Sequence, residues 1–190
     1  LLMQKPRSDL RPNTADYETV PLVKATGFRE YDARWILEKE INLLGIQALG
    51  LGLATYVHEI GQTPRIVVGH DFRSYSLSVK QALMLGLLQG GMEVLDIGLA
   101  LSPTAYFAQF ALDAPCVAMV TASHNENGWT GVKMGAKAPL TFGPDEIGRL
   151  KEIVLEGIGV ARPGGRLERV EGFREQYLQE VVGDIKISRP

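Results

Sequence analysis

Three consecutive residues in this sequence carry side chains that enzymes commonly use, a hydroxyl, an imidazole and an amide: Ser123, His124 and Asn125. They follow directly on the apolar run from Cys116 to Val120, and Lys133 stands shortly beyond them in a second apolar piece. Short apolar runs bounded by turn residues are typical of buried strands. The polar residues therefore lie at a strand end, where α/β domains usually place their chemistry.

Two other loops, over residues 26–34 and 70–74, also combine a strand end with charged side chains. Strand ends on one edge of a parallel sheet lie close together. Two guanidinium groups, an ammonium group and glycine-permitted backbone N–H groups suit phosphate. We therefore expect five side chains to share one anion-binding pocket: Arg34, Arg73, Ser123, His124 and Lys133.

A serine hydrolase is a second interpretation of Ser123 beside His124. Adjacent residues on extended backbone point in opposite directions, and the flanks lack the Gly-x-Ser-x-Gly elbow, so the local pattern argues against a hydrolase. A fluorophosphonate label on Ser123 would reveal one. A plain polar turn with its corner at Asn127-Gly128 is the third interpretation, and the side-chain chemistry alone leaves it open.

The composition is that of one globular domain, since the chain has 190 residues, of which 45% are hydrophobic and 22% charged. The formal net charge of −2 argues against a nucleic-acid partner, which would need a basic excess. No apolar run reaches transmembrane length, so we expect no membrane partner and a cytoplasmic location. A start at Leu1 without Met and a stop at Pro190 lead us to expect a piece of a longer protein.

The sequence contains few cysteine and histidine residues that could bind a metal ion or form a disulfide. Cys116 is the only cysteine and lies in a predicted strand, which excludes a disulfide framework and a cysteine-based zinc site. The three histidines, His58, His70 and His124, have no spacing that is typical of zinc ligands.

Hydrophobic periodicity and turn residues predict the order of the elements. Residues 1–21 are polar and contain three prolines, which predicts an extended N-terminal arm. Strands are expected over 22–25, 65–69, 93–97, 116–120 and 132–134, helices over 41–60, 76–90, 102–112, 143–155 and 171–184, and a loop or edge segment over 157–170. This alternation predicts an α/β fold, a three-layer αβα sandwich around a mixed, largely parallel sheet, over residues 22–187.

Three motifs together resemble a known enzyme family. Residues 121–125 followed by Gly131-Val-Lys133 resemble the active-serine loop of the α-D-phosphohexomutases, the phosphomannomutase/phosphoglucomutase family, which reads Thr-x-Ser-His-Asn-Pro-x-x-Tyr-Asn-Gly-x-Lys. Residues 28–34 resemble its Phe-Arg-x-Tyr-Asp-Ile-Arg-Gly stretch, and residues 68–73 its Val-Gly-Arg-Asp-x-Arg stretch. The resemblance runs from about residue 22 to the end. Within the family, the sequence resembles most the bacterial phosphomannomutase/phosphoglucomutase type. This resemblance implies the fold of the first domain of phosphoglucomutase.

The resemblance also implies a reaction. Members interconvert hexose 1-phosphates and 6-phosphates, of mannose or glucose here, through a phosphoserine and a bisphosphorylated sugar, with a glucose 1,6-bisphosphate-type activator. Ser123 would carry the phosphoryl group, Lys133 and Arg34 would act as acid, base and charge stabiliser, and His124 would orient the loop. Substrate-binding or loop-orienting roles are implied for Tyr31, Asn125, Gly131 and Arg73.

The resemblance implies that this chain holds only part of the catalytic machinery. Family members bind Mg²⁺ through the phosphoserine, here Ser123, and an Asp-Gly-Asp-x-Asp-Arg loop of the second domain, which residues 1–190 do not contain. Residues 188–190 would start the linker to that domain. The expected partners are phosphorylated hexoses and the remaining domains, and we expect no mutase activity from the fragment alone. A phosphoglucosamine mutase domain and a non-catalytic phosphosugar-binding module remain alternatives.

The sequence departs from the family pattern at several positions, of which four concern loop stiffness or charge. Glu126 replaces a Pro, Thr130 an Asn, Trp35 a Gly and His70 an Arg. Trp35 and Glu126 are expected to change loop stiffness and to shift substrate preference. None of the four is a reacting group, so the reaction class implied by the motifs is unchanged.

Overall fold

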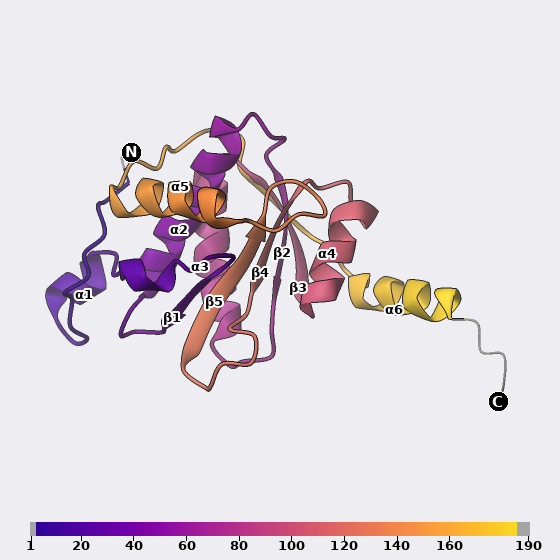
Figure 1. The fold of residues 1–190 in the computed structure, drawn as a ribbon, viewed down its shortest axis with the longest axis horizontal. Helices are drawn as coiled ribbons and strands as arrows, with labels where there is room; N and C mark the ends of the chain where they lie inside the picture. Colours follow the sequence, from indigo (N-terminus) through magenta and orange to yellow (C-terminus); the bar gives the residue numbers. More distant parts are fainter. Residues whose placement is uncertain (1–2, 186–190) are drawn as a thin grey trace.

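A six-stranded mixed sheet forms the centre of the computed structural model, which describes residues 3–185 (Figure 1). In spatial order the strands are β1 (Ala33–Ile36), β5 (Trp129–Gly135), β4 (Cys116–Val120), β2 (Arg65–His70), β3 (Glu93–Leu99) and β6 (Arg166–Arg169). The last four run parallel to one another, whereas β5 is antiparallel to both β1 and β4. β6 shows that the segment expected as a loop or an edge contains the edge strand.

Helices cover both faces of this sheet (Figure 1). One face carries α2 (Leu43–Glu59), α3 (Ser76–Gln89) and α5 (Pro144–Leu155), and the other carries α4 (Ser102–Ala111), beside which α6 (Phe173–Asp184) begins. The predicted three-layer α/β architecture is confirmed. In the part of the chain that the structure describes, no helix combines the length and the apolar character needed to cross a bilayer.

The central strands are apolar because both of their faces are buried. In β2, Ile66 and Val68 pack into the core beneath α2, α3 and α5, whereas Val67 lies between them in sequence and packs against α4. All of β4 is buried in the same way, and burial raises the pKa of Cys116 to about 12, so this thiol is inert. The sheet is therefore a rigid support for the loops at its edge.

The prediction of an extended N-terminal arm is wrong in part. The arm contains the short helix α1 (Ala15–Thr19), which is capped by Thr14. The strand expected over residues 22–25 is reduced to isolated bridges. The extended stretch is short because Ala25–Gly27 turn into a 3-10 helix. Before that turn the Leu22 N–H donates to Asn42 Oδ1 at 2.9 Å, and the Val23 N–H donates to the Arg7 carbonyl oxygen at 3.1 Å.

Candidate active site

Two loops lie next to each other where β2 and β4 end. Residues 71–75 follow β2 and residues 121–128 follow β4, and the Asp71 N–H donates to the Val120 carbonyl oxygen at 3.0 Å. Arg73 Nη2 donates to the carbonyl oxygens of Ser123 at 3.1 Å and Asn125 at 2.7 Å. Arg73, which belongs to the first loop, thus holds the second loop in position. This suits its expected role of fixing loops.

Ser123 has a left-handed backbone conformation, with φ of +56°. This conformation costs a non-glycine residue about 1 to 2 kcal/mol and persists where the surroundings impose it. Here the Ser123 N–H donates to Thr121 Oγ1 at 2.9 Å, while Arg73 holds the Ser123 carbonyl oxygen. The resulting bend leaves the Ser123 hydroxyl exposed to solvent.

The same bend corrects the prediction that Ser123 and His124 point apart. That prediction assumed extended backbone, whereas the left-handed Ser123 lies with its Oγ 3.4 Å from His124 Nδ1. Both side chains are exposed. Among the described residues no carboxylate bonds to the His124 ring, so the third member of a hydrolase triad is missing there.

Asp71 anchors the base of both loops with a buried carboxylate. It accepts from Ser76 Oγ at 2.5 Å, from the Arg73 N–H at 3.2 Å and from the Arg73 guanidinium. Burial alone raises the pKa of Asp71, but hydrogen bonds from Ser76, Thr121 and Arg73 outweigh burial and hold the pKa below its ordinary value. The carboxylate therefore stays charged and keeps Arg73 in place.

We predict that Asp71→Asn lowers the free energy of unfolding by about 2 kcal/mol at neutral pH, because an amide cannot pair with the charge of Arg73. Since the pKa of Asp71 is lower in the folded than in the unfolded chain, its contribution is complete above the unfolded value, about pH 4, and disappears as the pH falls through the folded value. Urea unfolding at neutral and at acidic pH measures this. The exposed Asp184→Asn is the control, and a deficit that persisted in acid would contradict the prediction.

Tyr75 closes the far end of the loop that carries Ser123. Its hydroxyl accepts from the Gly128 N–H at 2.9 Å and donates to the Trp129 carbonyl oxygen at 2.9 Å. Arg73 and Tyr75 thus hold the two ends of residues 123–129, and both come from the segment that follows β2. A loop tied at both ends presents its serine in one fixed position.

Arg34 and Lys133 project from the same face of neighbouring strands. Their sequence neighbours Trp35 and Val132 point into the core below α2, so alternation along the strands turns Arg34 and Lys133 to the opposite face. Asp32 Oδ2 accepts from Arg34 Nε at 2.9 Å and Nη2 at 2.7 Å and lies 3.7 Å from Lys133 Nζ. Two cations therefore share one carboxylate, which leaves an excess of positive charge.

A hydrogen bond joins this charged group to the serine loop. Arg34 Nη1 donates to Asn125 Oδ1 at 2.6 Å, across residues that are far apart in sequence. The loop is thus bonded to Arg34 on one side and to Arg73 on the other. An exposed hydroxyl beside fixed guanidinium and ammonium groups suits the binding and transfer of a phosphoryl group, which depends on positioning and positive charge.

Two of the predicted site residues have a different setting. Tyr31 is 58% exposed, and a hydrogen bond to Glu30 raises the pKa of its hydroxyl. Gly131 lies opposite Arg34 in the sheet, where a Cβ atom would come within 2.5 Å of the Ala33 carbonyl oxygen. Gly131 is therefore required for the close approach of β1 and β5.

A family model described as "Phosphoglucomutase/phosphomannomutase, alpha/beta/alpha domain I" matches residues 25–158, which include all three motifs. The chain belongs to this family. A phosphomannomutase of Escherichia coli is 37% identical over 172 residues, and a probable phosphoglucosamine mutase of Pyrococcus abyssi is 32% identical over 141 residues. These matches cover 88% and 73% of this chain but only 36% and 30% of the relatives.

Solved structures agree with this assignment. A phosphoglucomutase/phosphomannomutase family protein of Burkholderia thailandensis superposes with a TM-score of 0.82 at 27% identity, over 89% of this chain and 38% of that one. The chain therefore spans about a third of the length of the relatives that it matches. Its fold is that of the first domain of the phosphoglucomutase/phosphomannomutase family.

The departure at Trp35 has a different consequence from the one predicted. Trp35 lies in β1, fully buried, and its Nε1 donates to the Lys24 carbonyl oxygen at 2.8 Å, so it packs the core and does not stiffen a loop. Its direct partner across the sheet is Thr130, a second departure, whose buried Oγ1 has no hydrogen-bond partner within residues 3–185. Gly27 makes room for the indole ring, since a Cβ atom there would lie 1.9 Å from Trp35 Nε1.

His70 also lies away from the serine loop. Its Nδ1 is 2.9 Å from the Gly98 carbonyl oxygen, next to the buried ion pair of Lys80 with Asp96. Burial and the charge of Lys80 lower the pKa of His70, which keeps the ring neutral at physiological pH. Among the four departures, Glu126 alone is an exposed residue of the serine loop.

The described residues do not complete a magnesium site. Residues 3–185 contain no group of three or more His, Cys, Asp or Glu side chains that could hold a metal ion. The carboxylates beside the loop, Asp32 and Asp71, are engaged by Arg34 and Arg73.

Reasoning from the sequence missed three residues that position the site: Asp32, Asp71 and Tyr75. Asp32 and Asp71 stand within the motifs, two residues before Arg34 and Arg73, and this repeated Asp-x-Arg spacing was the available signal. Asp32 directly precedes β1 and Asp71 directly follows β2, so each pair stands where a strand meets a loop. Tyr75 carries no such signal, because its bonds depend on how the two loops meet.

Proposed function

We propose that this chain is the serine-bearing domain of a mutase that interconverts hexose 1-phosphate and hexose 6-phosphate. The observation that carries the proposal is the exposed, left-handed Ser123, whose loop is bonded to Arg73 and, through Asn125, to Arg34. Backbone strain of this kind is retained at functional sites. Membership of the phosphohexomutase family supports the same reading.

The reaction follows from phosphorylation of Ser123. A hydroxyl of the bound sugar monophosphate attacks the phosphorus atom, the bond between phosphorus and Ser123 Oγ breaks, and the sugar becomes a bisphosphate. After the sugar turns over, Ser123 Oγ attacks its other phosphate and releases the isomer. Lys133 accepts the proton of the attacking hydroxyl and donates it to Ser123 Oγ as the bond from Oγ to phosphorus breaks. Arg34, and Lys133 while it carries that proton, stabilise the charge on the transferring group. His124 and Asn125 orient the loop, and Arg73 fixes it.

Magnesium is part of this proposal. The ion supplies positive charge at the transferring phosphoryl group when it is bound. In this chain an oxygen of phosphorylated Ser123 would be its ligand, and the remaining ligands would come from a further domain. A bisphosphorylated sugar such as glucose 1,6-bisphosphate would prime the serine. One buried cysteine and phosphorylated substrates fit a cytoplasmic location.

Mannose and glucose phosphates are the proposed substrates, which is supported by similarity to a phosphomannomutase of Escherichia coli and to a phosphomannomutase/phosphoglucomutase of Pseudomonas putida. Glucosamine phosphate is a second candidate, which is supported by similarity to the probable phosphoglucosamine mutases of Pyrococcus. The full-length enzyme, assayed with glucose 1-phosphate, mannose 1-phosphate and glucosamine 1-phosphate, separates the two by the ratio of kcat/KM.

Mass spectrometry of the full-length protein tests the proposal itself. After incubation with glucose 1,6-bisphosphate, we expect one phosphate, located on Ser123. A protein that binds phosphosugars yet carries no phosphate on Ser123 would indicate the non-catalytic module instead. A fluorophosphonate label on Ser123 would indicate a hydrolase.

We predict that residues 1–190 alone do not convert hexose 1-phosphates, since they lack the Asp-Gly-Asp-x-Asp-Arg loop that the family resemblance implies and match only 36% of the Escherichia coli relative. A coupled assay for glucose 6-phosphate, with the full-length protein at equal concentration as the control, measures this. Robust turnover by the short chain would contradict the prediction.

A further inference from the structure

We propose that a hollow beside the serine loop is the docking site of another segment of the same full-length polypeptide, and that Phe72 couples this docking to the loop. The inference rests on the proposed function, because it takes this chain as one domain of a longer mutase. The hollow has a volume of about 330 Å³ and lies at the carboxyl ends of β2 and β3. Its lining residues are Asp71, Phe72, Leu99, Ala100, Leu101, Thr104, Arg174, Tyr177 and Leu178.

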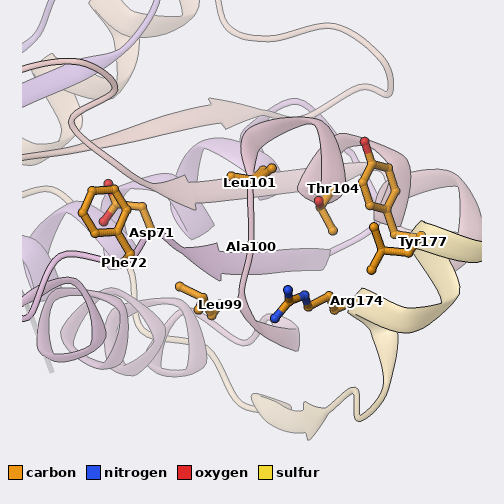
Figure 2. Close-up of a pocket in the computed structure, with 9 residues that line it drawn as sticks. Asp71, Phe72, Leu99, Ala100, Leu101, Thr104, Arg174 and Tyr177 are labelled. Atoms are coloured by element: carbon orange, nitrogen blue, oxygen red, sulfur yellow. The ribbon is translucent and has the colours of Figure 1, made fainter. Parts of the chain in front are cut away.

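Figure 2 shows how the two walls of the hollow are built. Asp71 and Phe72 stand at one end, Arg174 and Tyr177 stand at the other, and Leu99 and Leu101 lie between them. Large apolar side chains are open to solvent here, since Phe72 is 84% exposed and Leu101 is 69% exposed. Single exposed apolar residues are common, whereas a contiguous group around a hollow marks an interaction site.

α6 forms the second wall and is attached to the domain mainly by its first residue. Phe173 is buried against Phe107, whose ring also lies 5.5 Å from that of Tyr177. Beyond this contact the apolar residues of α6 are exposed, including Leu178 and Val182. Figure 1 shows the helix projecting from the body of the domain. A helix that is packed at only one end leaves its remaining apolar side chains for a partner.

The chemistry of the hollow indicates its occupant. Among the described residues Arg174 has no ion-pair partner, while the carboxylate of Asp71 is satisfied by Ser76 and Arg73. The lining is otherwise mostly apolar and suits a sugar poorly. A segment with an apolar side chain next to a carboxylate would fill the hollow. The apolar side chain would be buried against Leu101, and the carboxylate would pair with the guanidinium group of Arg174.

A segment of the same polypeptide fits this description best. The chain covers only 30% to 38% of the length of the relatives and of the solved structure described above. Most of such an enzyme is therefore supplied by further polypeptide, which would continue from the end of α6, the helix that forms one wall. Because the docking segment would be covalently connected to α6, its effective concentration at the hollow would be high. A modest apolar patch is then enough to bind it.

Phe72 lies between the two residues that hold the serine loop. Asp71 donates its N–H to Val120, and Arg73 bonds to the carbonyl oxygens of Ser123 and Asn125. The guanidinium carbon of Arg73 lies 5.8 Å from the centre of the Phe72 ring. A segment packed on Phe72 would restrict the backbone between these two anchors, and so restrict the loop that presents Ser123.

Cysteine accessibility in the full-length protein tests the docking. Leu101→Cys and Leu178→Cys are compared with Leu85→Cys, a control on α3 that is 56% exposed and lies on the other face of the sheet. We expect a maleimide to label positions 101 and 178 about tenfold more slowly than position 85 in the folded protein, and equally fast in urea. Labelling at the rate of position 85 under native conditions would overturn the proposal, whether or not the protein is a mutase.

A photo-crosslinker at position 72 identifies the occupant. Benzoylphenylalanine replaces Phe72 and, as the control, Phe110, which is 62% exposed at the far end of α4. We expect the position 72 product to be an intramolecular crosslink to a peptide beyond residue 190, one that contains an apolar residue beside Asp or Glu. A crosslink to a second copy or to another protein would overturn this assignment, and so would the absence of any product specific to position 72.

Hydrogen exchange tests the coupling. Phe72→Asp in the full-length protein should raise exchange over residues 121–128 by about tenfold, since the charge excludes the docked segment. Phe110→Asp should leave exchange over the same residues unchanged. Equal exchange in the two variants would refute the coupling. Neither readout depends on turnover, so the docking and the mutase proposal can fail independently.

Discussion

Ser123→Ala in the full-length enzyme should lower kcat for hexose phosphate isomerisation by about 10³-fold or more, because the variant has no atom that can carry the phosphoryl group. The fold should be unaffected, since the Ser123 hydroxyl is exposed and its one side-chain contact is His124 at 3.4 Å. The left-handed backbone remains equally accessible to Ala. A coupled assay at saturating substrate measures kcat, and thermal unfolding checks that the protein is intact.

Ser78→Ala is the matched control for this experiment, because Ser78 is an exposed serine on α3 with no part in the site. It should keep the full rate. An unchanged rate in Ser123→Ala would remove Ser123 from the carrier role. The proposed function requires two results from Ser123→Ala: the phosphate that mass spectrometry detects in the unchanged protein is absent, and turnover is lost.

Arg34→Lys should lower kcat/KM by about 10²-fold, although it conserves the charge. Arg34 uses three nitrogen atoms at once, with Nε and Nη2 on Asp32 and Nη1 on Asn125. A lysine ammonium has no planar fork and cannot hold both partners, so the loop would lose its link to β1 and Asp32 would shift toward Lys133. Steady-state kinetics with glucose 1-phosphate measure the loss.

Arg149→Lys is the control, since Arg149 of α5 forms its ion pairs at the surface, with Glu59 of α2 and Glu152 of α5. Surface pairs contribute little, so kcat/KM should stay within a factor of about two. If Arg34→Lys behaved like Arg149→Lys, positive charge alone would suffice at this position. The planar bridge to Asn125 would then have no part in catalysis.

The sequence by itself determined the class of fold and the reaction family. The apolar periods of α2, α3 and β4 depend on local spacing, so their positions followed from the sequence within a few residues. The motifs around Arg34, Arg73 and Ser123 carried the family, because each is a short contiguous pattern. Local pattern did not resolve the ends of elements, and the helix expected from residue 41 begins at Leu43.

The tertiary structure decided which of these residues meet. The strand order β1-β5-β4-β2-β3-β6 brings Arg34, from the start of the chain, to a loop 91 residues later, and no local signal specifies that order. Because side chains alternate along β1, Trp35 lies on the core face of the sheet and Arg34 on the site face. This difference was not predicted from the sequence, in which residues 26–34 were interpreted as one loop. The left-handed turn at Ser123 likewise depends on Arg73 and Thr121, contacts that exist only after β2 and β4 have paired. Long-range pairing therefore determines the geometry of the site, whereas local pattern determines its parts.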